Sequence, residues 1–175
     1  EILEKIDNWY KIIQCDGYKS YINKSNIVDP HAYINHSLKS ENKWYRVNKR
    51  ITKIKEVNNN GFKLLSFGSI IPVLTKENNS FVTIMPDETN YYIQTNSIIP
   101  YTEKNSFIDI VKYAMNNLGS PYFWGGKSGF GYDCSGFIQA LYRFKGISLP
   151  RDTKDQIMFA HLSKISSDYK MGDLI

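Results

Sequence analysis

One cysteine in the last third of the chain stands where a helix is expected to begin. The segment Asp133-Cys134-Ser135-Gly136-Phe137 follows a glycine-rich stretch, and apolar residues then recur at helical spacing. Backbone N–H groups and the helix macrodipole favour negative charge at a helix N-terminus, which stabilises a thiolate. The thiolate is the nucleophilic form of cysteine. These residues therefore predict cysteine-based bond cleavage with Cys134 as the nucleophile.

The neighbours of Cys134 suit this role. Gly129 and Gly131 let the backbone turn sharply before the cysteine, and Gly136 leaves the space behind it uncrowded. The backbone N–H of Cys134 is suited to an oxyanion hole. A carboxylate next to a thiolate disfavours its charge. We therefore expect Asp133 to point away from the sulfur and to bind a cationic group of the substrate.

Two helices are expected to hold this segment in place. The S-x-x-D pattern at residues 106–109 is typical of a capping box, and apolar residues follow at helical spacing up to Gly119. Residues 125–131 are rich in glycine and predict a loop. The second helix is expected to begin at Cys134 and to end at Gly146, a residue type common just past a helix C-terminus.

Two further elements are expected after this helix. Asp152 or Thr153 is suited to cap a third, shorter helix that runs through Ile157 and Phe159. Residues 171–175 carry a Gly-Asp pair before two apolar residues, a pattern that indicates a turn entering a strand.

Residues 1–100 lack helical periodicity and consist of short apolar or alternating runs separated by turn residues. Two such runs flank Asp16-Gly17, which is a strong hairpin signal. Cys15 is expected to be a small strand residue. Further runs are expected to be strands at 44–47, 51–57, 64–65, 70–74, 81–85 and 91–93. Many short strands with regular turns imply small β-barrels or sandwiches.

The two halves of this strand-rich region repeat one order of aromatic and turn residues. Residues 8–27 and 80–99 both resemble the last half of a bacterial SH3-like barrel. The resemblance implies an incomplete barrel at 1–30, a linker at 31–42 and a complete barrel at 43–101. With the helical segment at 105–175, the expected fold class is α+β.

The C-terminal motifs resemble the NlpC/P60 family of papain-like cysteine peptidases. The resemblance rests on Tyr122-Phe123-Trp124-Gly125-Gly126, Asp133 to Phe137, Leu149-Pro150-Arg151-Asp152-Thr153 and Gly172 to Ile175, in linked order. It implies cleavage of peptidoglycan stem peptides or muropeptides, commonly between γ-D-glutamate and a diamino acid. Members with tandem SH3-like barrels favour stems with a free N-terminal L-Ala, and we expect the barrels to restrict access to Cys134.

Residue roles follow from the same resemblance. Cys134 is the nucleophile, and Asp133 and Ser135 hold the free amine of the substrate. Tyr122 lies near the thiolate as a hydrogen-bonding partner. Arg151 is expected to be structural, tying its loop to a carboxylate. The resemblance implies no cofactor and no metal, and no ligand cluster in the sequence has suitable spacing.

This chain departs from the family's pattern at the general base. That base is a His on a strand after the Gly-Asp-Leu-Ile segment, whereas this chain ends at Ile175. His31, His36 and His161 do not match that position. We therefore expect the chain to be a fragment whose catalytic domain is truncated before its β-sheet, with activity that needs a His beyond Ile175.

Bulk composition excludes several classes. The chain has 175 residues, a formal net charge of +5 and 42% hydrophobic residues, which fits a folded globular protein. Its basic residues are scattered, so nucleic-acid binding is not expected. No apolar run approaches the roughly 18 residues of a membrane span. Two cysteines are too few for a disulfide framework, and both thiols are expected to be free.

Two rival functions remain open from the sequence. A catalytically inactive wall-binding protein would keep the barrels and hydrolyse nothing, which the missing His favours. An amidase or acyltransferase on the same scaffold would form different products. Wall remodelling implies the bacterial cell envelope or secretion, whereas recycling of stem peptides implies the cytoplasm.

Overall fold

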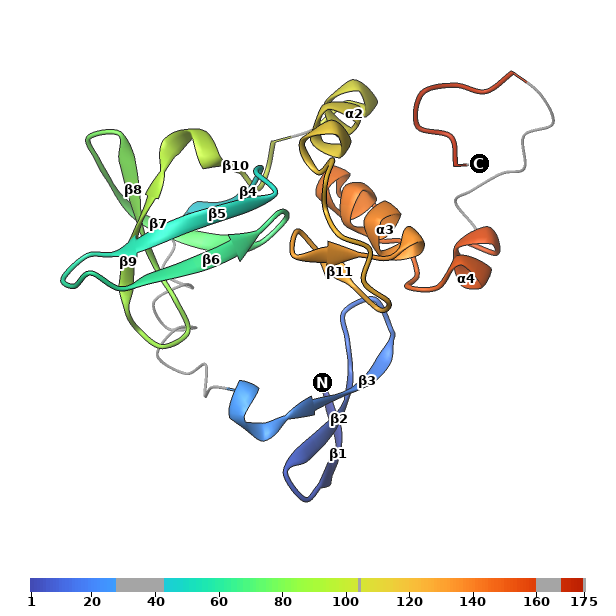
Figure 1. The fold of residues 1–175 in the computed structure, drawn as a ribbon, viewed down its shortest axis with the longest axis horizontal. Helices are drawn as coiled ribbons and strands as arrows, with labels where there is room; N and C mark the ends of the chain where they lie inside the picture. The colour runs from blue at the N-terminus through green and yellow to red at the C-terminus, as the bar shows by residue number, and fades with distance from the viewer. Residues whose placement is uncertain (28–42, 104, 160–167, 175) are drawn as a thin grey trace. The chain divides into compact units, whose positions relative to one another are not determined.

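The computed structural model describes residues 1–27, 43–103, 105–159 and 168–174 (Figure 1). Two compact units are present: unit 1 comprises Glu1–Tyr21 and Lys104–Ile175, and unit 2 comprises Ile22–Glu103. The fold is mixed α and β, as the sequence predicts. The SH3-like character of the strand-rich region and the domain boundaries stay predictions, and the linker at 31–42 lies outside the described residues.

Unit 2 contains one antiparallel sheet of seven strands in the order β10-β4-β7-β8-β9-β5-β6. The expected apolar runs are all strands. Their bounds are β4 Lys43–Val47, β5 Ile51–Glu56, β6 Phe62–Ser66, β7 Ile70–Glu77, β8 Ser80–Ile84, β9 Asn90–Gln94 and β10 Ile98–Pro100. Two short 3-10 helices, η1 Lys24–Asn26 and η2 Thr95–Ser97, complete the unit.

Alternation along the strands builds the core of unit 2. In β5, Ile54 is fully buried whereas Lys53 and Lys55 are exposed, as the two-residue side-chain period of a strand requires. The buried cluster joins residues from most strands: Val47, Ile54, Ile71, Val73, Met85, Tyr91, Ile93 and Ile98. Burial of this apolar surface is the main stabilising contribution to the unit.

A three-stranded sheet opens the chain, in the order β1 Ile2–Ile6, β2 Trp9–Ile13 and β3 Lys19–Asn23. The predicted Asp16-Gly17 hairpin is confirmed. Its turn is closed by the Gln14 N–H donating to the Tyr18 carbonyl at 2.9 Å, and Gly17 has the left-handed φ of +82° that glycine adopts easily. The strand placement of Cys15 is wrong, because β2 ends at Ile13 and the cysteine lies exposed in the turn.

Three helices form the remainder of unit 1: α2 Phe107–Asn116, α3 Cys134–Lys145 and α4 Thr153–Ile157. All three predicted helices are present, but the third ends at Ile157 and does not include Phe159 as expected. Ser106 and Asp109 form the expected capping box, and Gly146 ends α3 with a left-handed φ of +92°. The loop predicted at 125–131 is partly wrong, since β11 Lys127–Ser128 and β12 Gly131–Tyr132 pair there as a short hairpin.

The predicted turn near residue 172 is confirmed, with the Asp173 N–H donating to the Lys170 carbonyl at 3.0 Å. The strand expected after it is absent from the described residues 168–174, since no described strand pairs with this segment. The turn packs on the helices instead. The Tyr142 hydroxyl donates to the Gly172 carbonyl, and the Phe107 ring occupies the space that a side chain at Gly172 would need.

Candidate active site

Cys134 is the first residue of α3, and its side chain is exposed and free of disulfide bonding. Asp133 is the N-cap: its backbone is extended, and its Oδ1 accepts a hydrogen bond from the Gly136 N–H at 2.7 Å. This cap satisfies one of the N–H groups that a helix start leaves without an intrahelical partner. The local sequence therefore places the thiol at the positive end of the helix dipole.

The Asp133 carboxylate lies in an ion pair with Arg151. Arg151 Nη2 is 2.5 Å from Asp133 Oδ2, and Arg151 Nη1 is 3.1 Å from Oδ1. The backbone N–H of Gly125 donates to Oδ2 at 2.9 Å. Both side chains are buried, with 8% of Arg151 and 11% of Asp133 exposed. The Arg151 hydrogen bonds hold the pKa of Asp133 below its ordinary value, against the opposing effect of burial.

Arg151 also binds Ser135 and so joins its loop to the start of α3. Arg151 Nη1 donates to Ser135 Oγ at 2.9 Å. Gln156 of α4 donates through Nε2 to the Ser135 carbonyl at 3.2 Å and to the Pro150 carbonyl at 2.9 Å. The sequence interpretation did not single out Gln156, because an amide in a short helix carries no motif. Together these bonds connect the Pro150 loop and α4 to the residues around Cys134.

Gly136 is required by a close backbone approach. A Cβ built at this residue would lie 2.2 Å from the Gly126 carbonyl oxygen and 2.9 Å from Asp133 Oδ1. The same Gly126 carbonyl accepts the Asp133 N–H at 3.0 Å. The absence of a side chain thus lets the glycine-rich segment pack directly on the first turn of α3.

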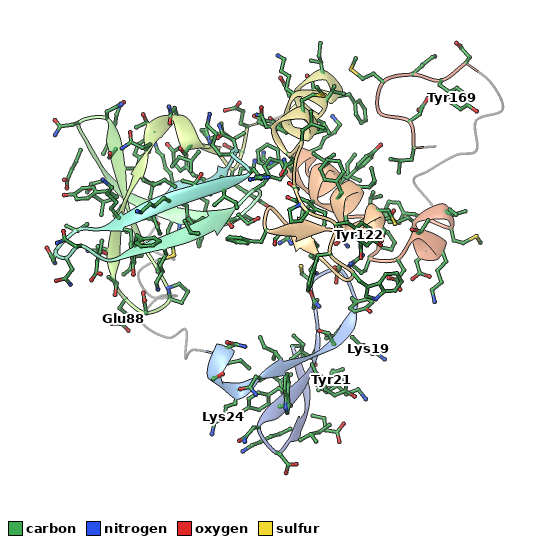
Figure 2. The ribbon with its side chains drawn as sticks, in the orientation of Figure 1. Lys19, Tyr21, Lys24, Glu88, Tyr122 and Tyr169 are labelled. Carbon is green, nitrogen blue, oxygen red and sulfur yellow. The ribbon has the colours of Figure 1, made fainter. Side chains whose placement is uncertain are left out.

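An open pocket with a volume of about 530 Å³ surrounds the exposed thiol. The four site residues predicted from the sequence, Cys134, Asp133, Ser135 and Tyr122, all line it. Tyr122 is 67% exposed (Figure 2), which leaves its hydroxyl accessible from the pocket. Trp124 also lines the pocket. The chain fold thus brings together residues that the sequence places in two separate motifs.

The β2–β3 turn and the start of β3 supply a further part of the pocket lining: Gln14, Tyr18 and Ser20. Sequence reasoning missed these residues, because nothing in a hairpin motif shows which distant segment it contacts. Figure 1 shows this turn beside β11, and both belong to unit 1. The pocket therefore combines residues more than 100 positions apart in the chain.

Histidine does not occur among the described residues, because His31, His36 and His161 fall in 28–42 and 160–167. Among the residues that the structure describes, no three His, Cys, Asp or Glu side chains are grouped to hold a metal ion. The described helices include none that is long and apolar enough to cross a membrane.

Comparison with known proteins connects this geometry to a family. Residues 119–175 match the model of the NlpC/P60 family. The chain is 37% identical over 111 residues to the gamma-D-glutamyl-L-lysine dipeptidyl-peptidase of Bacillus subtilis (strain 168), covering 63% of this chain and 37% of that protein. It is 42% identical over 67 residues to the probable endopeptidase p60 of Listeria welshimeri, covering 38% of this chain and 12% of that protein. The chain thus spans about a third or less of the length of these relatives.

Solved structures show the same fold. An NlpC/P60 family protein from Bacillus cereus superposes with a TM-score of 0.84 at 21% identity, covering 98% of this chain and 60% of that one. An NlpC/P60 endopeptidase from Photobacterium damselae gives a TM-score of 0.60 at 23% identity, covering 85% of this chain and 33% of that one. The resemblance to the NlpC/P60 family is confirmed, and the named relatives support a peptidase.

Proposed function

We propose that this chain carries the nucleophile of a cysteine peptidase that cleaves peptidoglycan stem peptides at the γ-D-glutamyl–diamino acid bond. The NlpC/P60 match and the relatives named as peptidases support this class of reaction. The observation that carries the proposal is the exposed Cys134 thiol at the start of α3, which lines an open pocket of about 530 Å³. The relatives named for γ-D-glutamyl-L-lysine support the choice of bond.

The proposed reaction has two steps. The Cys134 thiolate attacks the γ-carbonyl carbon, and backbone N–H groups at the α3 N-terminus stabilise the oxyanion. The C–N bond then breaks, the amine of the diamino acid leaves with a proton, and a thioester remains on Cys134. Water attacks this thioester and releases the γ-glutamyl carboxylate and the free thiol. The general base that moves these protons is proposed to be a histidine.

Electrostatics near the thiol support this role for Cys134. An unpaired carboxylate beside a thiolate would destabilise its charge. The Arg151 guanidinium neutralises Asp133 within the buried pair and leaves no net charge there. The macrodipole of α3 then acts on the thiolate without opposition from its neighbour.

The substrate contacts are proposals of the same kind. Asp133 and Ser135 are proposed to receive the free amine of the stem, and Tyr122 to donate a hydrogen bond near the thiolate. Because Arg151 already shares the Asp133 carboxylate, an incoming ammonium group would share that charge with the guanidinium. We further propose that the strand-rich region forms SH3-like barrels that restrict the pocket to short stems, and that the protein acts in the cell envelope or after secretion.

Hydrolysis of L-Ala-γ-D-Glu-L-Lys by the full-length protein tests the proposal. Products are identified by mass spectrometry for the wild type, Cys134→Ala and the matched control Cys15→Ala, whose thiol is also exposed. We expect release of free lysine by the wild type and the control, and none by Cys134→Ala. A folded full-length protein that leaves this peptide intact would contradict the proposal and favour a wall-binding function. Transfer of the L-Ala-γ-D-Glu acyl group to an amine in place of water would indicate an acyltransferase.

A further inference from the structure

We propose that Asp16 is a positioning residue that fixes the β2–β3 turn as one wall of the Cys134 pocket, so that its loss weakens substrate binding more than the chemical step. This inference rests on the proposed peptidase function for its kinetic test. A second test needs no substrate and depends only on the contacts of Asp16 in the structure.

The burial of Asp16 is unusual for its place in the chain. It lies in a tight hairpin turn between the exposed residues Cys15 and Gly17, yet only 7% of its side chain is exposed. A carboxylate in such a turn ordinarily faces water, because burial of a charge is costly unless partners replace the solvent. Partners must therefore come from elsewhere in unit 1.

Those partners belong to the segment that carries Cys134. Lys127 Nζ of β11 is 3.2 Å from Asp16 Oδ2, and Gln139 Nε2 of α3 donates to the same oxygen at 3.0 Å. The other oxygen, Oδ1, accepts only the local Tyr18 N–H, at 3.1 Å. Oδ1 thus bonds within the hairpin turn, whereas Oδ2 attaches the turn to residues more than 100 positions later in the chain.

Both remote partners connect the attachment to the pocket. Lys127 lines the pocket and also donates to Gln14 Oε1 at 2.5 Å, and Gln14 is itself a lining residue. Gln139 is buried and also donates to the Leu149 carbonyl at 3.0 Å. Leu149 precedes the loop that carries Arg151. Asp16 is therefore bonded to two elements that hold the pocket residues, although it is not itself at the reacting centre.

Electrostatics agree with this geometry. Burial raises the pKa of Asp16, but the hydrogen bonds from Tyr18, Lys127 and Gln139 together outweigh it and leave the pKa below its ordinary value. The charged carboxylate is therefore the form that the structure stabilises at neutral pH.

The two carboxylate oxygens of Asp16 have different partners, so one substitution can remove the remote hydrogen bonds and keep the local one. Asp16→Asn keeps Oδ1 for the Tyr18 N–H and so preserves the local turn. It places an NH₂ group where Oδ2 accepted from two donors, and three donor groups then face one another. Lys127 loses its counter-ion but keeps Gln14 as an acceptor and stays one-third exposed to solvent, and Gln139 keeps the Leu149 carbonyl, so each donor retains a hydrogen-bond acceptor. Asp7→Asn is the matched control, because Asp7 is an exposed aspartate in the β1–β2 turn of the same sheet.

Two measurements on the full-length protein test the inference. The first is hydrogen exchange of the peptide covering residues 14–20. We expect Asp16→Asn to speed exchange about tenfold, the factor for loss of one charge-assisted hydrogen bond, with no change in Asp7→Asn. The second is steady-state kinetics on L-Ala-γ-D-Glu-L-Lys. We expect KM to rise about tenfold in Asp16→Asn and kcat to stay within about twofold.

The outcomes separate this inference from the proposed function. Unchanged exchange in Asp16→Asn overturns the inference whether or not the protein cleaves the peptide. Faster exchange with unchanged KM overturns the positioning role and leaves the peptidase proposal standing. A fall in kcat alone, or an equal effect of Asp7→Asn, also overturns it. Faster exchange in a protein that cleaves nothing supports the attachment of the turn and contradicts the proposed function.

Discussion

Replacement of Arg151 by Ala removes the guanidinium from the buried pair beside Cys134. Three hydrogen bonds are lost: two to the Asp133 carboxylate and one to Ser135 Oγ. Asp133 is left charged with two backbone donors, the N–H groups of Gly125 and Gly136. The first turn of α3 then depends on an N-cap that carries an uncompensated, largely buried charge.

The expected loss of folding free energy follows from these lost hydrogen bonds. Removal of one partner from a buried ion pair costs about 3 to 5 kcal/mol. The two remaining backbone donors and the adjacent pocket place Arg151→Ala near the lower end, at about 3 kcal/mol. Arg151→Lys supplies a point charge in place of the planar fork, reaches one oxygen and is expected to cost about 1 to 2 kcal/mol.

Native-state hydrogen exchange of α3 in the full-length protein measures this cost directly. A loss of about 3 kcal/mol lowers the protection of the α3 amides by about a hundredfold. Arg143→Ala is the matched control, because it removes the same charged group from an exposed position of the same helix. We expect it to change protection by less than about 1 kcal/mol.

A double-mutant cycle decides whether the Asp133 pair is responsible. Arg151→Ala and Asp133→Asn should be strongly non-additive, because each removes the same interaction, with a coupling of at least about 1 kcal/mol. Additive effects, or α3 protection in Arg151→Ala equal to that of Arg143→Ala, would refute the assignment of Arg151 as the residue that holds the start of α3.

Two further predictions follow from the same segment. The pKa of Asp133 is lowered in the folded protein from the ordinary 3.8, so its contribution to stability is complete above that value and is lost as the pH falls through the lower folded value. Acid unfolding followed by circular dichroism should therefore be steeper below pH 3.8 in the wild type than in Asp133→Asn, and identical acid limbs would contradict this. Gly136→Ala forces a Cβ to within 2.2 Å of the Gly126 carbonyl oxygen, a backbone atom that cannot move freely. We expect a loss of about 1 to 3 kcal/mol in thermal unfolding, and a melting temperature equal to that of the wild type would show that the glycine segment moves aside.

Local patterns in the sequence were sufficient to predict most elements. The capping box at Ser106 and Asp109, the helix start at Cys134 and the hairpin at Asp16-Gly17 each depend on neighbours a few residues away. A strand with one buried face shows alternating apolar and polar residues, and this alternation can be seen in the sequence itself. The role of Arg151 as a tie to a carboxylate was also expected, from the family resemblance of the segment around it.

The wrong predictions concern segments in which the local sequence signals for secondary structure are weak. The short hairpin of β11 and β12 occupies a glycine-rich stretch without strand propensity, and its pairing is imposed by the packing of Gly131 and Tyr132 against the preceding segment. Cys15 follows an alternating run that is typical of a strand, but it lies two residues past the end of β2. The turn at Gly172 contacts α2 and α3 through Phe107 and Tyr142, contacts that no local pattern encodes.

The sequence by itself determined that Cys134 stands at a helix start, and it is the basis for proposing this thiol as the nucleophile. Only the tertiary structure decided which groups surround that thiol. It paired the Asp133 carboxylate with Arg151, placed Gln156 in hydrogen-bonding distance of the Ser135 carbonyl and brought the turn that carries Asp16 to the pocket wall. The physical reason is distance along the chain. A helix cap or a turn is closed by atoms within a few residues, whereas a buried charge takes whichever partner the packing of distant elements brings within hydrogen-bonding reach.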